Sequence, residues 1–219
     1  MKKFLVIAAL LFLGAGCGVP KSAKIAVPFT PQAPQGDWSQ PWQDACEETS
    51  IYMVSSFYAD DPIRREEAVK RIREILKVKN ETIKVSLDES LETIAKLIDE
   101  LGMPWTTELK VDPTAEDLKR ELAAGRPIIV PVYAPALRNP YYTADYHVLV
   151  LTGYDDEKDD FIVNDPGTRS GEGLRFPQDV FMAAIHDLNP RDKDAGRKAV
   201  LFTRQNDWRE WFEGLGSGP

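Results

Sequence analysis

The hydrophobic pattern of the chain changes once, and this change constrains the fold more than any other feature. Between residues 46 and 124 apolar side chains recur at helical spacing, whereas from residue 127 onward they form short β-branched runs separated by turns. The pattern predicts helices over 46–58, 64–76, 86–101, 114–124 and 177–188, and strands over 25–29, 127–133, 147–154, 161–164 and 198–203. Helices followed by antiparallel strands indicate an α+β fold instead of alternating βαβ units.

Charge and residue counts exclude several classes of function. The chain has 27 Lys and Arg against 35 Asp and Glu, a formal net charge of −8, so its surface would repel nucleic acid. Two Cys and two His are too few for a disulfide scaffold or a zinc-finger array, and no phosphate-binding glycine loop occurs. The sequence therefore predicts no cofactor, no metal site and no nucleic-acid partner.

The first residues have the layout of a bacterial secretory signal. Lys2 and Lys3 precede an apolar run over 4–13, which is shorter than the ~20 residues that a membrane-spanning helix needs. Cys17 follows small residues, an arrangement that resembles the lipobox of bacterial lipoproteins, in which that cysteine is acylated. We expect a signal peptide over 1–16 and export, either as a cell-envelope lipoprotein anchored through Cys17 or, if that cysteine is incidental, as a secreted protein.

Three residues further along could act together chemically. Cys46 begins a predicted helix, where unpaired N–H groups and the helix dipole favour a thiolate. His147 begins one predicted strand and Asp165 follows the next, so an antiparallel hairpin brings both to the same end, where a carboxylate orients an imidazole. Each also has an ordinary structural interpretation, as a core cysteine, a half-buried strand histidine and a turn-forming aspartate.

These positions carry a resemblance to a known family. The segment from Val27 to Gln32 (VPFTPQ), Cys46 at a helix start, the segment from Tyr146 to Asp155 (YHVLVLTGYD) and Val163 to Pro166 (VNDP) resemble the peptidase C39-like family. The resemblance implies a papain-like cysteine peptidase fold with N-terminal helices packed on an antiparallel sheet. It implies a peptidase domain over 25–205, preceded by a linker over 17–24 and followed by a C-terminal tail over 206–219.

The resemblance also implies roles for single residues. Cys46 would be the nucleophile, His147 the general base and acid, and Asp165 the residue that orients the imidazole. The oxyanion hole would take its side-chain donor from Gln32, or alternatively from Gln40, with the Cys46 backbone N–H as the second donor. One departure stands out, because family members often have glycine after the cysteine, whereas this chain has Glu47 and Glu48. Acids so close to the sulfur oppose thiolate formation.

Together these features favour an exported cysteine hydrolase that cleaves peptide or related amide bonds through a thioester intermediate. Its partner would be a peptide or protein substrate, with the membrane contacted only through the N-terminal anchor. Two alternatives remain: an acyl or amide transferase on the same fold, and a non-enzymatic peptide-binding module, which the acids beside Cys46 favour. Trp38 and Trp42 are candidates for an aromatic wall of the substrate cleft, and His186 is interpreted as structural.

Overall fold

The computed structural model of the chain describes residues 19–83, 88–139, 142, 144–192 and 195–206. The predicted signal peptide, Cys17 and the residues beyond 206 lie outside the described residues. In the part that is described, no helix is both long enough and apolar enough to cross a membrane.

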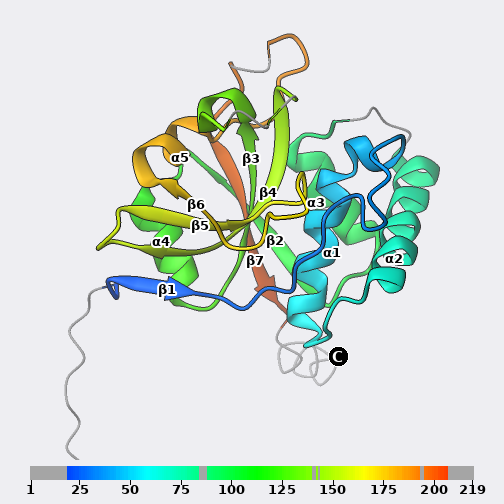
Figure 1. Cartoon of the computed structure of the whole chain (residues 1–219), viewed down its shortest axis with the longest axis horizontal. Helices are drawn as coiled ribbons and strands as arrows, with labels where there is room; N and C mark the ends of the chain where they lie inside the picture. Colours follow the sequence, from blue (N-terminus) through cyan, green and yellow to red (C-terminus); the bar gives the residue numbers. More distant parts are fainter. Residues whose placement is uncertain (1–18, 84–87, 140–141, 143, 193–194, 207–219) are drawn as a thin grey trace, which may run out of the picture.

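A single antiparallel sheet forms the centre of the molecule (Figure 1). Its strands follow the order β2-β7-β3-β4-β5-β6, and β1 pairs with the far end of β4. The strands are β1 (Ser22–Lys24), β2 (Trp105–Val111), β3 (Ile128–Tyr133), β4 (Tyr146–Asp155), β5 (Asp160–Asn164), β6 (Leu174–Pro177) and β7 (Ala199–Gln205). The predicted α+β class, with N-terminal helices on an antiparallel sheet, is confirmed.

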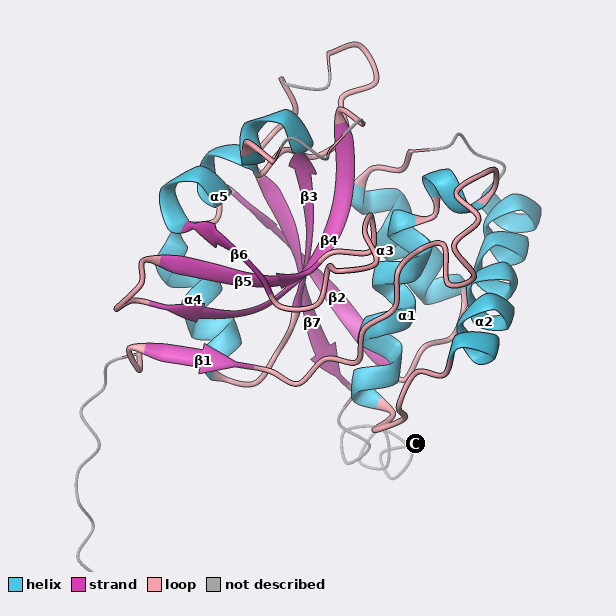
Figure 2. Ribbon diagram, in the orientation of Figure 1, coloured by secondary structure: helices cyan, strands magenta, loops and turns pink. Residues whose placement is uncertain are grey.

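Helices cover the sheet on both sides (Figure 2). They are α1 (Cys46–Tyr58), α2 (Arg65–Val78), α3 (Leu91–Glu100), α4 (Ala115–Ala123) and α5 (Gln178–Ala184), with shorter turns η1 (Trp42–Asp44), η2 (Lys79–Ile83) and η3 (Ala134–Leu137). Helix α1 packs against β4, while α4 packs against β3 and β4. Every residue of β4 up to Tyr154 is buried, which explains why its sequence is a continuous apolar run instead of an alternating one.

Two helix boundaries differ from the prediction. Helix α3 begins at Leu91, not at residue 86, because Ser90 is its N-cap and accepts a hydrogen bond from the Thr93 backbone N–H. The last helix ends at Ala184 instead of 188. Ile185 bridges to Val132 of β3, which pulls the chain out of the helix.

The strand predictions were wrong at three places. The first strand covers 22–24, inside the segment expected to be a linker, and not 25–29, where Pro28 and Pro31 have no backbone N–H to donate. Strand β2 was missed because its pattern is mixed: Thr106 and Glu108 are exposed and polar, but Val111 is exposed and apolar. The short strand β6 (Leu174–Pro177) lies outside every predicted strand.

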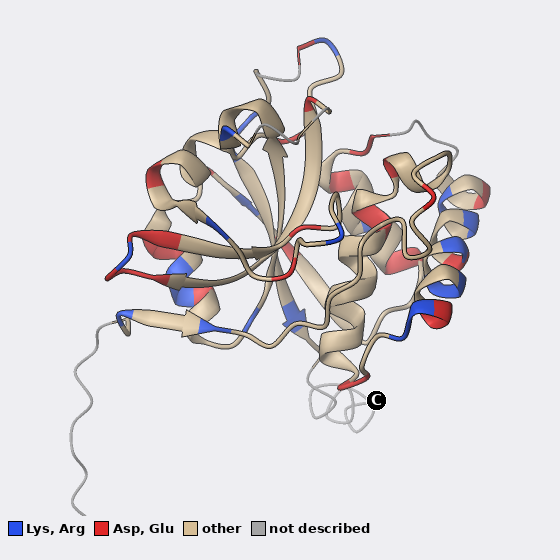
Figure 3. Ribbon diagram, viewed as in Figure 1, with Lys and Arg blue, Asp and Glu red and all other residues tan. Residues whose placement is uncertain are grey.

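Charged side chains gather on helix α2 and at the β4–β5 turn (Figure 3). Basic and acidic side chains form ion pairs along the exposed face of helix α2. One of them joins Arg71 Nε to Glu67 Oε1 over 2.8 Å. The β4–β5 turn carries an acidic cluster, which the sequence presents as Asp155, Asp156, Asp159 and Asp160. Arg175 lies 3.2 Å from the Asp155 carboxylate, and Lys119 lies 2.6 Å from that of Asp156. These carboxylates therefore balance cations that fold against the turn.

Candidate active site

The hairpin of β4 and β5 brings His147 and Asp165 into direct contact. His147 is the second residue of β4 and Asp165 follows the last residue of β5, and the antiparallel register places Asn164 opposite Val150. His147 Nε2 lies 2.6 Å from Asp165 Oδ1. Both side chains are buried, the carboxylate completely. The structure thus joins two of the three residues that the sequence singled out.

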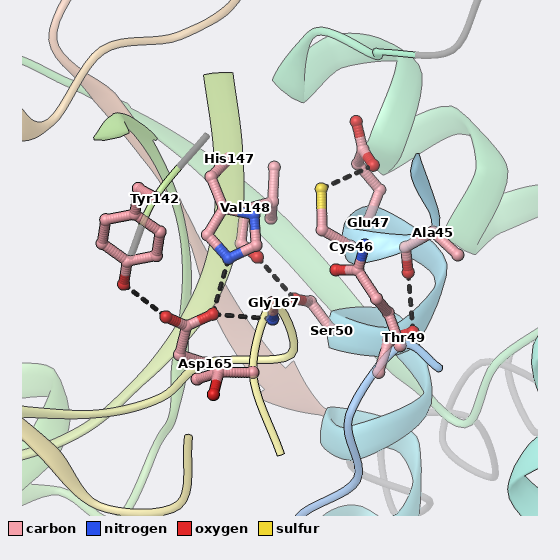
Figure 4. Close-up of polar contacts among 12 residues, drawn as sticks. Ala45, Cys46, Glu47, Thr49, Ser50, Tyr142, His147, Val148, Asp165 and Gly167 are labelled. Carbon is pink, nitrogen blue, oxygen red and sulfur yellow. Dashed lines mark hydrogen bonds and ion pairs between the residues drawn. The ribbon is translucent and has the colours of Figure 1, made fainter. Parts of the chain in front are cut away.

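Asp165 is held as a carboxylate by three donors. Besides His147, the Gly167 backbone N–H donates to Oδ1 over 2.8 Å and the Tyr142 hydroxyl donates to Oδ2 (Figure 4). Burial alone would raise the pKa of Asp165, but the positive charge of His147 and these hydrogen bonds hold it below its usual value. A fixed acceptor of this kind orients an imidazole. Tyr142 was not predicted from sequence, because no motif spacing connects it to Asp165.

Gly167 is required by the close approach of the backbone to the imidazole. A Cβ added at this position would lie 2.9 Å from His147 Cε1 and Nε2 and 3.1 Å from Asp165 Oδ1. No other residue type fits there unless the His147–Asp165 pair moves. The turn after Asp165 therefore clamps the imidazole from one side.

Cys46 is the first residue of α1, where the sequence placed the nucleophile. Helix α1 packs on β4, and the Ser50 hydroxyl donates to the Val148 carbonyl over 3.4 Å, so the start of the helix lies beside His147. The thiol points to its neighbour: Cys46 Sγ–H donates to Glu47 Oε2 over 3.0 Å. Burial raises the pKa of Cys46, and the charge and hydrogen bond of Glu47 raise it further. The residue is therefore a thiol in this arrangement.

Behind Cys46 lies a buried group of charges, which we call the acid–lysine cluster: Glu47, Glu48, Lys79 and Glu89. Glu47 and Glu48 are fully buried in α1. Lys79 Nζ lies 2.7 Å from Glu48 Oε1 and 3.5 Å from Glu89 Oε1. Burial, followed by the charge of Glu48, raises the pKa of Glu47 to about 8, while Lys79 partly opposes this shift. The sequence indicated the two glutamates but not Lys79 or Glu89, which come from other segments.

The two glutamines considered for the oxyanion hole have different surroundings. Gln32 is buried, and its backbone N–H donates to the Pro166 carbonyl over 2.8 Å, which ties it to the turn after Asp165. Its side-chain Nε2 donates to the carbonyls of Trp42 and Gln43 over 2.9 and 2.7 Å. Gln40 is exposed and donates to Asp44. Of the two, Gln32 lies beside His147.

A cleft opens next to the His147 ring. It has a volume of about 310 Å³ and is lined by Gln32, Trp38, Gln43, Tyr142, Ala144, His147 and Gly167. A second cleft of about 610 Å³ shares Trp38, Tyr142 and Gly167 with it, so the two are continuous, and it extends to Arg169 and Leu174. Trp38 thus has the position expected of a cleft wall. Trp42 does not line these clefts, because it is buried beneath Arg73, whose guanidinium carbon lies 5.3 Å from the ring centre.

His186 lies apart from this cleft. Its Nδ1 is 3.1 Å from the Ala184 carbonyl and its ring packs against Tyr133, with the two ring centres 6.3 Å apart. The residue follows α5 instead of lying on it. Its contacts are those of a half-buried packing residue.

Comparison with known proteins gives four findings. The sequence model of the Peptidase_C39 like family matches residues 24–184. A crystal structure described as that of a C39-like peptidase from Bacillus anthracis has a TM-score of 0.56 at 18% identity and covers 86% of this chain and 100% of its own. Xylellain, a cysteine protease from Xylella fastidiosa, has a TM-score of 0.43 at 14% identity, with 87% and 88% covered. No curated protein matches the chain.

Proposed function

The chain belongs to the Peptidase_C39 like family, and from this premise we propose that it is a cysteine hydrolase that cleaves peptide or related amide bonds through a thioester. One observation carries the proposal: the buried His147–Asp165 pair, 2.6 Å apart, at the strand end against which the Cys46 helix packs. A nucleophile, a base and a group that orients the base are the parts that thiol-based acyl transfer requires.

The first step is the loss of the Cys46 proton. Because His147 Nε2 is engaged by Asp165, Nδ1 is the nitrogen that receives it. The Sγ–H now points to Glu47, so rotation about the Cβ–Sγ bond has to turn this proton toward the imidazole. The buried Asp165 carboxylate then stabilises the imidazolium that forms.

The thiolate next attacks the carbonyl carbon of the scissile amide. A C–S bond forms, the carbonyl electron pair moves to oxygen, and the negative charge is stabilised by the Cys46 backbone N–H at the start of α1. When the tetrahedral species collapses, the C–N bond breaks and His147 gives its proton to the leaving amine. Water, deprotonated by the same imidazole, then hydrolyses the thioester and restores the thiol.

Gln32 is our choice for the second oxyanion donor, because it lines the cleft beside His147 whereas Gln40 is exposed. In the present arrangement its amide N–H groups donate hydrogen bonds to the Trp42 and Gln43 carbonyls. Donation to a substrate therefore requires that the amide leaves at least one of these partners. A Gln32→Ala variant should lose activity, while a Gln40→Ala variant should keep it.

The alternative with support in the structure is a peptide-binding module without catalysis. The contact between Cys46 and Glu47 favours it, since burial and the acid raise the pKa of the thiol. A transferase would use the same residues with an amine as the acceptor.

The test is cleavage of a peptide mixture of known sequences by the full chain, followed by mass spectrometry, with a Cys46→Ala variant as the control. New peptide ends that depend on Cys46 support the hydrolase. Ends joined to an amine, when one is added, indicate a transferase. Peptides retained on the protein but left uncut indicate the binding module.

We also propose export through the N-terminal segment, with Cys17 as the acylated residue and with the predicted 25–205 domain extended at its start to include β1. The layout of Lys2, Lys3, the apolar run and Cys17 supports this proposal. In a bacterial host the chain should fractionate with membranes, and a Cys17→Ala variant should not. Equal distribution of both chains would contradict the lipid anchor.

A further inference from the structure

Each of the two carboxyl oxygens of Glu47 contacts a different group. Oε2 lies 3.0 Å from Cys46 Sγ, while Oε1 accepts the Glu89 backbone N–H over 3.0 Å. Glu47 is fully buried, so no solvent reaches either oxygen. An oxygen that accepts an N–H group cannot also carry the acid proton toward it. If Glu47 is neutral, its proton is therefore on Oε2, from which it can turn toward the sulfur once the thiol has lost its own proton.

Charge in the acid–lysine cluster favours a neutral Glu47. The cation that the described residues place in the cluster is Lys79, and it lies closest to Glu48, at 2.7 Å, with Glu89 at 3.5 Å. Three ionised glutamates would exceed this single positive charge in a buried space. Among the described residues, the other titratable groups on this side are Asp88 from the segment before α3, Tyr146 of β4, whose hydroxyl donates to the Glu89 carbonyl, and Asp187, which lies toward Tyr146. None of these groups supplies a second positive charge.

We propose that Glu47 acts as a neutral carboxylic acid that donates its Oε2 proton to the Cys46 thiolate, so that the nucleophile is available only while Glu47 is protonated. This role rests on the proposed hydrolase function. The Cys46 proton passes to His147 Nδ1, the sulfur becomes negative, and the hydrogen bond that ran from Sγ–H to Oε2 is replaced by one from Oε2–H to sulfur. Glu47 keeps its proton throughout, so no group besides the imidazole gains or loses one.

The proposal has a pH dependence with a definite sign. Burial raises the pKa of Glu47 to about 8. Below that pH the neutral acid stabilises the thiolate, whereas above it the ionised carboxylate repels it. The reactive thiolate–imidazolium form should therefore decline as the pH rises through about 8, although free thiols become more reactive in the same range.

The experiment compares alkylation of Cys46 by iodoacetamide in the wild type and in Glu47→Gln between pH 6 and 9.5, with the site mapped by mass spectrometry. The amide keeps an acceptor for the Glu89 N–H and a permanent donor for the sulfur, so it imitates the neutral acid. The ratio of variant to wild-type rate should be near one at pH 6 and rise about tenfold above pH 8, the factor that corresponds to one pKa unit. A ratio that is constant with pH would overturn the proposal.

Two further variants separate the possible outcomes. His147→Ala tests the proposed function: if it alkylates as the wild type does, that function fails, while the ratio for Glu47→Gln still decides the role of Glu47. Glu48→Gln leaves Lys79 free for Glu47, so the alkylation rate of Cys46 in this variant should decline at a lower pH than in the wild type. A decline at the same pH would contradict the proposal even if Glu47→Gln does not fold. Glu81→Gln, whose carboxylate is exposed beside Lys77, is the control for loss of a charge and should match the wild type.

Discussion

The candidate site has two halves that are built in different ways. On the sheet half, His147, Asp165, Tyr142 and Gly167 form short contacts in which each donor meets an acceptor. On the helix half, Cys46 faces a buried acid, and Lys79, the cation that the described residues place in the cluster, is engaged by Glu48. The difference teaches that the proposed base and its carboxylate partner already have the contacts that catalysis would require, whereas under our proposal the thiol depends on the protonation and charge of the acid–lysine cluster.

The largest effect should come from breaking the sheet half. An Asp165→Asn variant keeps the shape of the site but removes the negative charge that stabilises the imidazolium, so kcat/KM for peptide cleavage should fall by about 10⁴. The rate is measured on a peptide found in the mixture experiment. A fall of less than tenfold would mean that Asp165 does not orient the base.

A change in the helix half should lower the stability of the protein. A Lys79→Met variant leaves the carboxylates of Glu48 and Glu89 buried without their cation, and the free energy of unfolding should fall by about 3–5 kcal/mol. Urea denaturation at pH 7 measures the change. Lys77→Met is the matched control, because Lys77 is exposed and lies 3.9 Å from Glu81, and it should change stability little. Equal effects of the two variants would refute the assigned role of Lys79.

The fit of the backbone on the imidazole can be tested with one methyl group. Gly167→Ala places a Cβ 2.9 Å from the His147 ring, which has to shift, and a misplaced base should lower kcat by about 10²-fold. Gly102→Ala adds a methyl group where no atom lies within 4 Å. Its φ of +61° makes the substitution costly in stability, but kcat should remain unchanged. If Gly167→Ala is as active as Gly102→Ala, the turn does not fix the base.

The smallest effect should come from the hydroxyl on the Asp165 carboxylate. Tyr142→Phe removes one of its three donors, so kcat/KM should fall about tenfold, in line with a hydrogen bond to a charged group of about 1.5 kcal/mol. Tyr133→Phe is the control, because Tyr133 packs against His186 and away from the cleft. A Tyr142→Phe variant with full activity would show that the other two donors suffice.

The sheet half could be predicted from sequence because it depends on local order along the chain. The ends of two strands joined by a short turn determine that His147 and Asp165 meet, and the helix 46–58 has the predicted bounds. The same reasoning failed for β2 and β6, whose hydrophobic patterns are mixed and whose pairing with β7 and β5 is set by the whole sheet.

The helix half could be predicted only in part. The acids after Cys46 were visible, and their opposition to a thiolate follows from their position. Their burial was not visible, nor was the partner Lys79 from the turn after α2, nor the Glu89 N–H that binds Glu47 from 42 residues away. Contacts between distant segments carry no periodic signal, so the electrostatics of the nucleophile needed the folded chain.

The central claim is that the two halves act together, with Cys46 giving its proton to His147. The most direct test is the rate at which a dipeptidyl chloromethyl ketone alkylates the full chain at pH 7, with the label mapped to Cys46 because Cys17 is the other cysteine. We predict labelling of the wild type at Cys46 and at least about 10²-fold slower labelling of His147→Ala, in the range that general-base assistance supplies. Equal rates in the two proteins would contradict the claim.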